Sequence, residues 1–203
     1  MKEYINLFLS SILAGLCISI GCIINLQVGG VIGAVLFTFG LITVVHYKYA
    51  LYTGTAGFID SWKSFLNLIC ILVFNIIGCF GTAYLISLAI PDLQDKVITI
   101  IQNRESQEIW SALIRGVFCG FLMTTAVKFG RENRWLPLLW AVPVFILAGF
   151  YHSIADAFYI GLSHTQSIQV YYNWGMTIIG NFIGCNLFNL LVNKTIIYKE
   201  DEC

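Results

Sequence analysis

Six long apolar stretches divide this chain of 203 residues and leave little sequence for anything else. A helix needs about 20 mainly apolar residues to cross the hydrocarbon core of a bilayer. We expect crossings at residues 5–26, 30–52, 65–90, 109–127, 135–150 and 173–196. Hydrophobic residues make up 58% of the chain and charged residues only 11%, which excludes a soluble domain of this size. The sequence predicts one all-α integral membrane domain over residues 1–203, embedded in the lipid bilayer of the cell membrane.

A five-residue motif occurs twice, at residues 75–79 (Asn-Ile-Ile-Gly-Cys) and 181–185 (Asn-Phe-Ile-Gly-Cys), in the third and sixth apolar stretches. Glycine lets membrane helices approach closely and asparagine hydrogen-bonds across the contact, so helix packing is the simplest interpretation. The repeat also aligns two halves, about 1–91 and 109–203. Because each half holds an odd number of crossings, we expect two inverted three-helix repeats around one midplane, an architecture typical of transporters.

The basic residues of the loops predict the orientation, because lysine and arginine in short loops favour the cytoplasmic side. Most fall on one side of a six-crossing chain, namely Lys2, Lys63, Lys128, Arg131, Arg134, Lys194 and Lys199. Only Lys96 and Arg104, in the polar segment 92–108 that we expect to be a loop, fall on the other side. Both termini are therefore predicted to be cytoplasmic.

Several functions are disfavoured by what the sequence contains. A formal net charge of zero argues against a nucleic-acid partner. The seven cysteines lie mostly within the crossings and show neither disulfide nor metal spacing. Neither a nucleophile–base set nor a phosphate-binding glycine loop is present. We expect no enzymatic activity, cofactor or metal site.

Two crossings contain interruptions near membrane depth. The second meets residues 52–57 (Tyr-Thr-Gly-Thr-Ala-Gly) and the fifth meets residues 151–156 (Tyr-His-Ser-Ile-Ala-Asp). Irregular backbone there is tolerated only where protein buries it or water reaches it. We therefore expect helices two and five to be broken and to line a cavity, with the hydroxyls of Thr53, Thr55 and Ser153 facing it.

Ionisable residues inside a crossing are candidates for function because a charge in hydrocarbon is costly. His152 and Asp156 lie four residues apart and share a face if the helix resumes at Ser153. A carboxylate beside the imidazole would favour the protonated histidine. A lone membrane histidine is more often a packing residue, but the location of His152 in a break opposite a second break favours function. For Lys48, in the second crossing, a structural role is favoured.

Four segments together resemble the formate/nitrite transporter family. They are residues 33–41 (Gly-Ala-Val-Leu-Phe-Thr-Phe-Gly-Leu), 51–55 (Leu-Tyr-Thr-Gly-Thr), 148–156 (Ala-Gly-Phe-Tyr-His-Ser-Ile-Ala-Asp) and 180–184 (Gly-Asn-Phe-Ile-Gly). The match covers nearly the whole chain in the right order, and the stretch around His152 is its most specific part. The resemblance implies an aquaporin-like protomer, a homopentamer, and one pore in each protomer for small monovalent anions.

The resemblance also implies roles for individual residues. His152 matches the family's central pore histidine, and Thr53 matches the threonine that faces it. Arg104 stands, by its spacing of sixteen residues from position 120, where relatives have a lysine that attracts anions. The apolar constrictions of relatives fall at Phe37, Leu41, Tyr52, Met123 and Phe145.

Besides the arginine at position 104, the chain departs from the family pattern at four positions. Tyr151 replaces an acidic residue before the histidine, Ala50 replaces an acidic or amide residue before the first break, and Gly120 replaces an asparagine. Asp156 stands where relatives have asparagine, so one carboxylate is gone and another has appeared nearby. These departures imply a retuned His152, a different permeant species or a different hydrogen-bond arrangement.

Residues and resemblance together predict a channel or transporter for small monovalent weak-acid anions such as formate, nitrite and hydrosulfide, or for their neutral acids. A charged anion does not cheaply pass rings such as Phe37 and Phe145, so a proton from His152 would neutralise it at the narrowest point. Two alternatives stay open. An aquaporin-like channel for a small neutral solute is weakened by the absence of paired Asn-Pro-Ala loops, and a non-transporting membrane scaffold is favoured by the departures.

Overall fold

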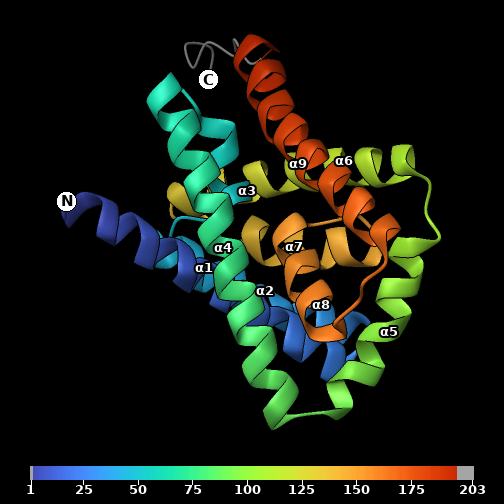
Figure 1. Cartoon of the computed structure of the whole chain (residues 1–203). Helices are drawn as coiled ribbons and strands as arrows, with labels where there is room; N and C mark the ends of the chain where they lie inside the picture. The colour runs from blue at the N-terminus through green and yellow to red at the C-terminus, as the bar shows by residue number, and fades with distance from the viewer. Residues whose placement is uncertain (1, 196–203) are drawn as a thin grey trace.

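The computed structural model describes residues 2–195, and these residues form a bundle of helices (Figure 1). In chain order the elements are α1 (Lys2–Val28), α2 (Gly30–His46), α3 (Tyr52–Thr55), the 3-10 turn η1 (Ala56–Phe58), α4 (Trp62–Ala89), α5 (Asp92–Glu105), α6 (Ile109–Arg131), α7 (Trp135–Leu147), α8 (Ser153–Ser163) and α9 (Ile168–Thr195). Lys199, one of the cations that predict the orientation, lies outside the described residues.

Three helices are long and apolar enough to cross a bilayer, over Tyr4–Val28, Trp62–Ala89 and Ile109–Arg131. Two shorter apolar helices, α2 and α7, fill the second and fifth predicted crossings, and each is followed by a break and a further short helix. The all-helical membrane fold with interrupted second and fifth crossings is therefore confirmed. The inverted relation of the two halves stays a prediction.

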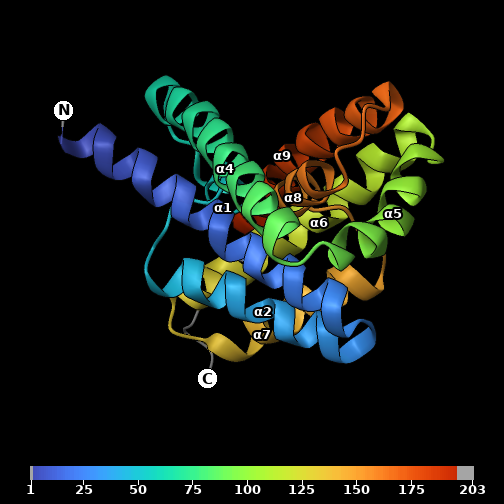
Figure 2. The same cartoon turned by 60° about the horizontal axis from the view of Figure 1, so that its bottom comes forward.

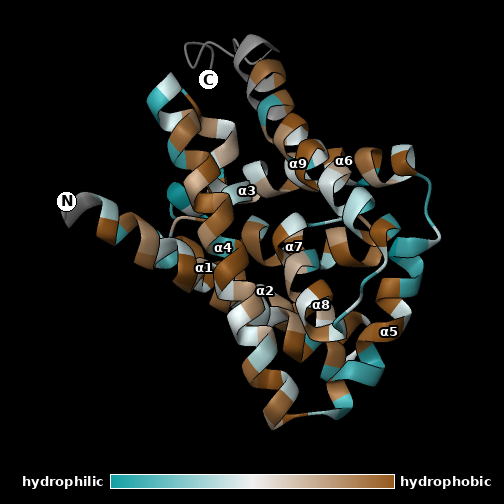
Figure 3. Cartoon of the chain, in the orientation of Figure 1, coloured by the Kyte–Doolittle hydropathy of each residue, from teal (hydrophilic) through white to brown (hydrophobic). Residues whose placement is uncertain are grey.

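Many large apolar side chains are exposed on the outside of the bundle. Most of the long helices are accordingly coloured as hydrophobic in Figure 3. In water such a surface would drive aggregation, whereas lipid chains are as apolar as the side chains themselves. The most exposed of them include Ile32, Phe39, Trp62, Leu85, Leu88, Trp110, Leu136 and Tyr172. This surface fits a multi-pass membrane protein.

The polar segment 92–108 is not the loop that the sequence predicts, because most of it forms α5. Leu93, Val97 and Ile101 recur every fourth residue, lie on one face of the helix and are buried against the bundle. The rest of α5 is mostly polar and is largely coloured as hydrophilic in Figure 3. Its amphipathic period places Arg104 in the last turn, next to the fifth crossing.

The repeated motif packs two pairs of long helices, α1 with α4 and α6 with α9. A Cβ added at Gly78 would collide with the carbonyl oxygen of Ile12, and one added at Gly184 would collide with that of Val117. Only glycine allows these backbones to approach so closely, as predicted. The two shorter apolar helices, α2 and α7, lie side by side beneath these pairs (Figure 2). The ring centroids of Phe37 and Phe145 are 5.9 Å apart there, in an edge-to-face arrangement.

Candidate permeation site

Both breaks consist of extended backbone followed by a new helix. In the first, Leu51 has φ −104° and ψ 133° immediately before α3. In the second, Gly149 has φ 71°, a conformation that glycine adopts without strain, and His152 has φ −105° and ψ 112° before α8. Some N–H groups of these segments bond back to the preceding helix, but the peptide groups next to Leu51 and His152 need other partners.

Asn75 holds the first break. Its Nδ2 donates to the carbonyl oxygens of Ser11 at 2.7 Å and Ala50 at 2.9 Å, and its Oδ1 accepts from the N–H of Tyr52 at 2.8 Å. The side chain is fully buried. One amide therefore ties α4 to α1 and satisfies the peptide groups on either side of Leu51.

Asn181 holds the second break in the same way. Its Nδ2 donates to the carbonyl oxygens of Gly116 and Tyr151, both at 2.8 Å, and its Oδ1 accepts from the N–H of Ser153 at 2.8 Å. The two residues bonded in the break flank His152, just as Ala50 and Tyr52 flank Leu51. Each asparagine of the motif therefore supports an interruption in addition to packing two helices.

The cysteines of the motif connect each half to the break of the other. The Cys79 thiol donates to the carbonyl oxygens of Gly15 at 3.4 Å and Ile154 at 3.3 Å, and both bonds are buried. The Cys185 thiol lies equivalently, 3.4 Å from the carbonyl oxygen of Thr53 and 3.3 Å from that of Gly120. Each motif cysteine thus ties a long helix of one half to the short helix that follows the break of the other half.

The breaks bring Thr53 and His152 together. Oγ1 of Thr53 lies 2.9 Å from Nε2 of His152, and both side chains are buried. His152 also caps α8, because its Nδ1 accepts from the N–H of Ala155 at 3.2 Å. A ring nitrogen that accepts a hydrogen bond carries no proton, so these partners assign a neutral imidazole with its hydrogen on Nε2.

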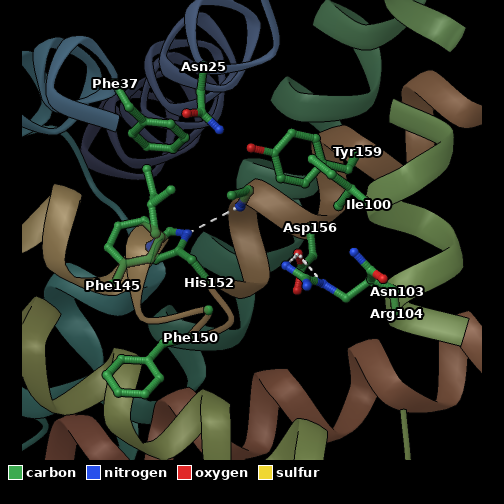
Figure 4. A pocket seen from close by; sticks show the side chains of 13 residues that line it. Asn25, Phe37, Ile100, Asn103, Arg104, Phe145, Phe150, His152, Asp156 and Tyr159 are labelled. Carbon is green, nitrogen blue, oxygen red and sulfur yellow. Dashed lines mark hydrogen bonds and ion pairs between the residues drawn. The ribbon is translucent and has the colours of Figure 1, made fainter. Parts of the chain in front are cut away.

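A cavity of about 160 Å³ lies beside His152 (Figure 4). Phe37 and Phe145 form its apolar wall, and the Phe145 ring stacks on the imidazole with centroids 5.7 Å apart. Asn25, Asn103, Arg104, Asp156 and Tyr159 contribute its polar groups. A water molecule occupies roughly 30 Å³ in the liquid, so the cavity has room for about five waters or one small anion.

Asp156 pairs with Arg104 and not with His152. Its Oδ1 accepts from Nε of Arg104 at 3.0 Å and from Nη2 at 2.9 Å, while Oδ2 is buried without a hydrogen-bond partner among the described residues. The guanidinium carbon of Arg104 also lies 3.5 Å from the centroid of the Tyr151 ring. The expected pair between the Asp156 carboxylate and the His152 imidazole is therefore wrong, and Asp156 forms an ion pair with Arg104 instead. Arg104, Tyr151 and Asp156, three positions that differ from the family pattern, contact one another.

Two contacts that the sequence does not reveal position this cluster. Nδ2 of Asn173 donates to the carbonyl oxygens of Arg104 at 2.7 Å and Gln107 at 2.9 Å, which fixes the end of α5 on α9. Nη1 of Arg115 donates to the carbonyl oxygen of Gly149 at 2.9 Å, so Arg115 supports the second break. Neither residue has a spacing signal, because both partners are backbone atoms distant in sequence.

A larger cavity of about 730 Å³ opens at the first break. Leu51, Gly54 and Thr55 line it, together with three basic side chains, His46, Lys48 and Arg131, and none of the described residues that line it is acidic. Arg131 donates from Nη2 to the carbonyl oxygen of Gly54 at 3.2 Å. Lys48 is exposed beyond the end of α2, not inside the crossing as predicted. This cavity therefore presents positive charge at its walls.

The predicted constriction residues divide between wall and interior. Phe37 and Phe145 line the small cavity. Leu41 and Met123 are buried one helical turn from residues of the large cavity, Val44 and Val127, and line neither space. Leu41 also lies on the same face of α2 as Phe37 and Val44, which line the small and the large cavity respectively.

The hydroxyl groups of the breaks are used differently from the expectation. The Thr55 hydroxyl donates to the carbonyl oxygen of Leu51 at 2.8 Å, at the wall of the large cavity. The Ser153 hydroxyl is buried without a partner among the described residues and lines neither cavity. Tyr52, the last predicted constriction residue, is also buried, and its hydroxyl donates to the carbonyl oxygen of Ile178 at 3.1 Å.

Gly120, where relatives have an asparagine, packs on the carbonyl oxygen of Asn181. A Cβ at this position would collide with that oxygen, so an asparagine does not fit there.

These features define a class: a helical membrane protein with two broken helices that meet between two cavities. A model of the family described as formate/nitrite transporter matches residues 1–195, and the chain belongs to this family. The fold is that of solved relatives with 19% identity. One, described as a pentameric formate channel with formate bound, has a TM-score of 0.82 and matches over 95% of this chain and 97% of its own.

A second solved structure, described as an FNT family ion channel, has a TM-score of 0.83 and the same 19% identity, with 95% of this chain and 90% of its own covered. A search of curated proteins found no match. The family resemblance and the all-helical membrane fold predicted from the sequence are confirmed.

Proposed function

We propose that the chain is a membrane channel or transporter for small monovalent weak-acid anions of the formate, nitrite and hydrosulfide class. The passage runs from the large cavity, past Thr53 and His152, into the small one. The observation that carries the proposal is the 2.9 Å contact between Thr53 and His152, which joins two helix breaks that each border a cavity. Membership in a transporter family supports it.

In this passage His152 acts as a hydrogen-bond donor. Its Nδ1 is held by the N–H of Ala155, so a second proton would set two N–H groups against each other and displace the first turn of α8. The donor that reaches a solute is the Nε2–H, directly or through the Thr53 hydroxyl. Proton donation by His152, as the sequence suggests, would require that turn to move.

The solved relative described as a pentameric formate channel supports a homopentamer with one passage in each protomer. We place the protein in the cell membrane with both termini in the cytoplasm, on the distribution of basic residues. The neutral-solute alternative predicts osmotic swelling without anion movement. The scaffold alternative predicts neither.

The test is uptake of labelled formate, nitrite and hydrosulfide into proteoliposomes. We expect wild type to transport at least one of them and His152→Ala and His152→Asn to lose at least tenfold in rate. His164→Asn is the matched control: His164 caps the other end of α8 with φ 52°, a conformation that asparagine also adopts, and lines neither cavity. Absence of flux in wild type, or equal flux in all four proteins, would contradict the proposal.

A further inference from the structure

The ion pair in the small cavity has a consequence for the charge of the permeant. We propose that Asp156 determines which protonation state enters the small cavity, and that it selects the neutral acid over the anion. This inference rests on the proposed function. It concerns a residue at which the chain departs from its relatives.

The first step is the charge balance at Arg104. Its Nε and Nη2 both donate to one oxygen of Asp156, and the two side chains are only 17% and 3% exposed. The partners are too close for solvent to separate their charges, so the pair acts on a solute as a dipole and not as a positive charge. The other residues that line the cavity are amides, aromatic or aliphatic side chains, a glycine and the neutral His152. A free anion therefore meets no uncompensated cation there.

Tyr151 contacts Arg104 without adding a charge to the Arg104–Asp156 pair. The ring lies 3.5 Å from the guanidinium carbon of Arg104 and 5.2 Å from that of Arg115, within the range of a cation–π interaction. An acidic residue at position 151 would add a second negative charge beside Asp156. An aromatic face stabilises the cation and leaves one carboxylate paired with Arg104. The tyrosine and the aspartate therefore belong to one arrangement.

The second step is the unpaired oxygen of Asp156. Oδ2 is buried and has no hydrogen-bond partner among the described residues, although the residue lines the cavity. A buried acceptor without a donor is unfavourable, and Oδ2 itself is closed to a water-sized solute, so the carboxylate gains by turning toward a solute that brings an O–H or S–H group. Formic acid, nitrous acid and hydrogen sulfide each carry one such hydrogen. Formate and nitrite have no O–H hydrogen to donate to Oδ2. Hydrosulfide keeps its S–H group, but the carboxylate repels its negative charge.

The third step is the route onward from Asp156. Phe37 and Phe145 form the apolar wall next to His152, and a neutral molecule passes such rings at far lower free energy than an ion. The acid keeps its own proton throughout, and anion and proton leave together on the far side. Transport is thus one anion with one proton, without net charge and without a second proton on His152.

The experiment compares wild type, Asp156→Asn and the double variant Arg104→Gln/Asp156→Asn in proteoliposomes, with formate flux and current recorded across a pH series. Asparagine retains an oxygen acceptor for Arg104 but leaves its positive charge uncompensated. We expect wild-type flux to fall about tenfold per pH unit above the pKa of the acid, with no current. We expect Asp156→Asn to carry a formate current, to flatten the pH dependence, and to bind formate at least tenfold more tightly at pH 7. The double variant removes both charges and should lose the current.

The wild type alone can overturn the inference, whatever the variants do. A formate current through wild type, or wild-type flux that follows the anion concentration across pH, would refute it. So would a well-folded Asp156→Asn protein without current or tighter binding. Absence of formate flux in wild type would instead refute the proposed function. The experiment therefore distinguishes failure of this inference from failure of the proposed function.

Discussion

Substitution of Asn75 by alanine should lower the stability of the fold substantially, because one side chain holds three backbone groups. The change removes three hydrogen bonds, of 2.7, 2.9 and 2.8 Å, to Ser11, Ala50 and Tyr52. The Ser11 carbonyl lies within α1, where helical bonding continues to satisfy it. The Ala50 carbonyl and the Tyr52 N–H lie in the break and lose the partner that holds them.

Leaving a buried peptide group unsatisfied costs about 1–3 kcal/mol, so two groups give roughly 2–6 kcal/mol. At about 2–4 °C per kcal/mol for a chain of this size, Tm should fall by at least about 4 °C. The assay is thermal unfolding in detergent. The matched control is Asn67→Ala on the same helix, because Asn67 makes no side-chain hydrogen bond among the described residues. Equal Tm values for the two variants would refute the role assigned to the repeated asparagine.

Three further predictions follow from the same geometry. Gly184→Ala should destabilise the protein by at least about 1 kcal/mol, because its Cβ would meet the Val117 carbonyl, whereas Gly175→Ala, with open space on the same helix, should be neutral or stabilising in the same thermal assay. Thr53→Val removes the acceptor of the His152 Nε2–H at a cost of about 1–3 kcal/mol, so formate uptake should fall roughly 5- to 150-fold; unchanged uptake would disprove the pairing. Phe145→Ala opens the wall of the small cavity and should raise chloride leak in a liposome assay, and a leak equal to that of wild type would place the narrow point elsewhere.

The sequence predicts the features that depend on composition and local pattern. The crossings follow from apolar length, and the breaks follow from runs of small and hydroxyl residues at membrane depth. The motif glycines pack helices as expected. Thr53 and His152 stand at the two breaks that the sequence marks, and the fold brings these breaks within hydrogen-bond distance of each other.

The pairing of Asp156 is what local pattern fails to predict. A spacing of four residues places side chains on one face only when both residues are helical. His152 is the residue before α8, and its extended φ and ψ turn the imidazole toward Thr53 and away from the helix face that carries Asp156. The partner of Asp156 comes from α5, 52 residues earlier, and no local spacing reveals such a contact.

The same limit applies to α5 and to the asparagine supports. A loop interpretation of segment 92–108 overlooks the stripe of Leu93, Val97 and Ile101, because the segment is polar on average. The motif marks Asn75 and Asn181 as special, but the peptide groups that they satisfy lie 23–30 residues away in sequence. Only the fold brings them together.

The most direct test of the passage is to block it from the large cavity. Thr55→Cys places a thiol on the wall of that cavity, one helical turn from Leu51. A bulky thiol reagent should then reduce formate uptake by at least tenfold. The same reagent should leave wild type unaffected, because the cysteines of the described residues are buried apart from the half-buried Cys70, which lines neither cavity. Full uptake by the completely modified variant would contradict a passage through the large cavity and past Thr53 and His152.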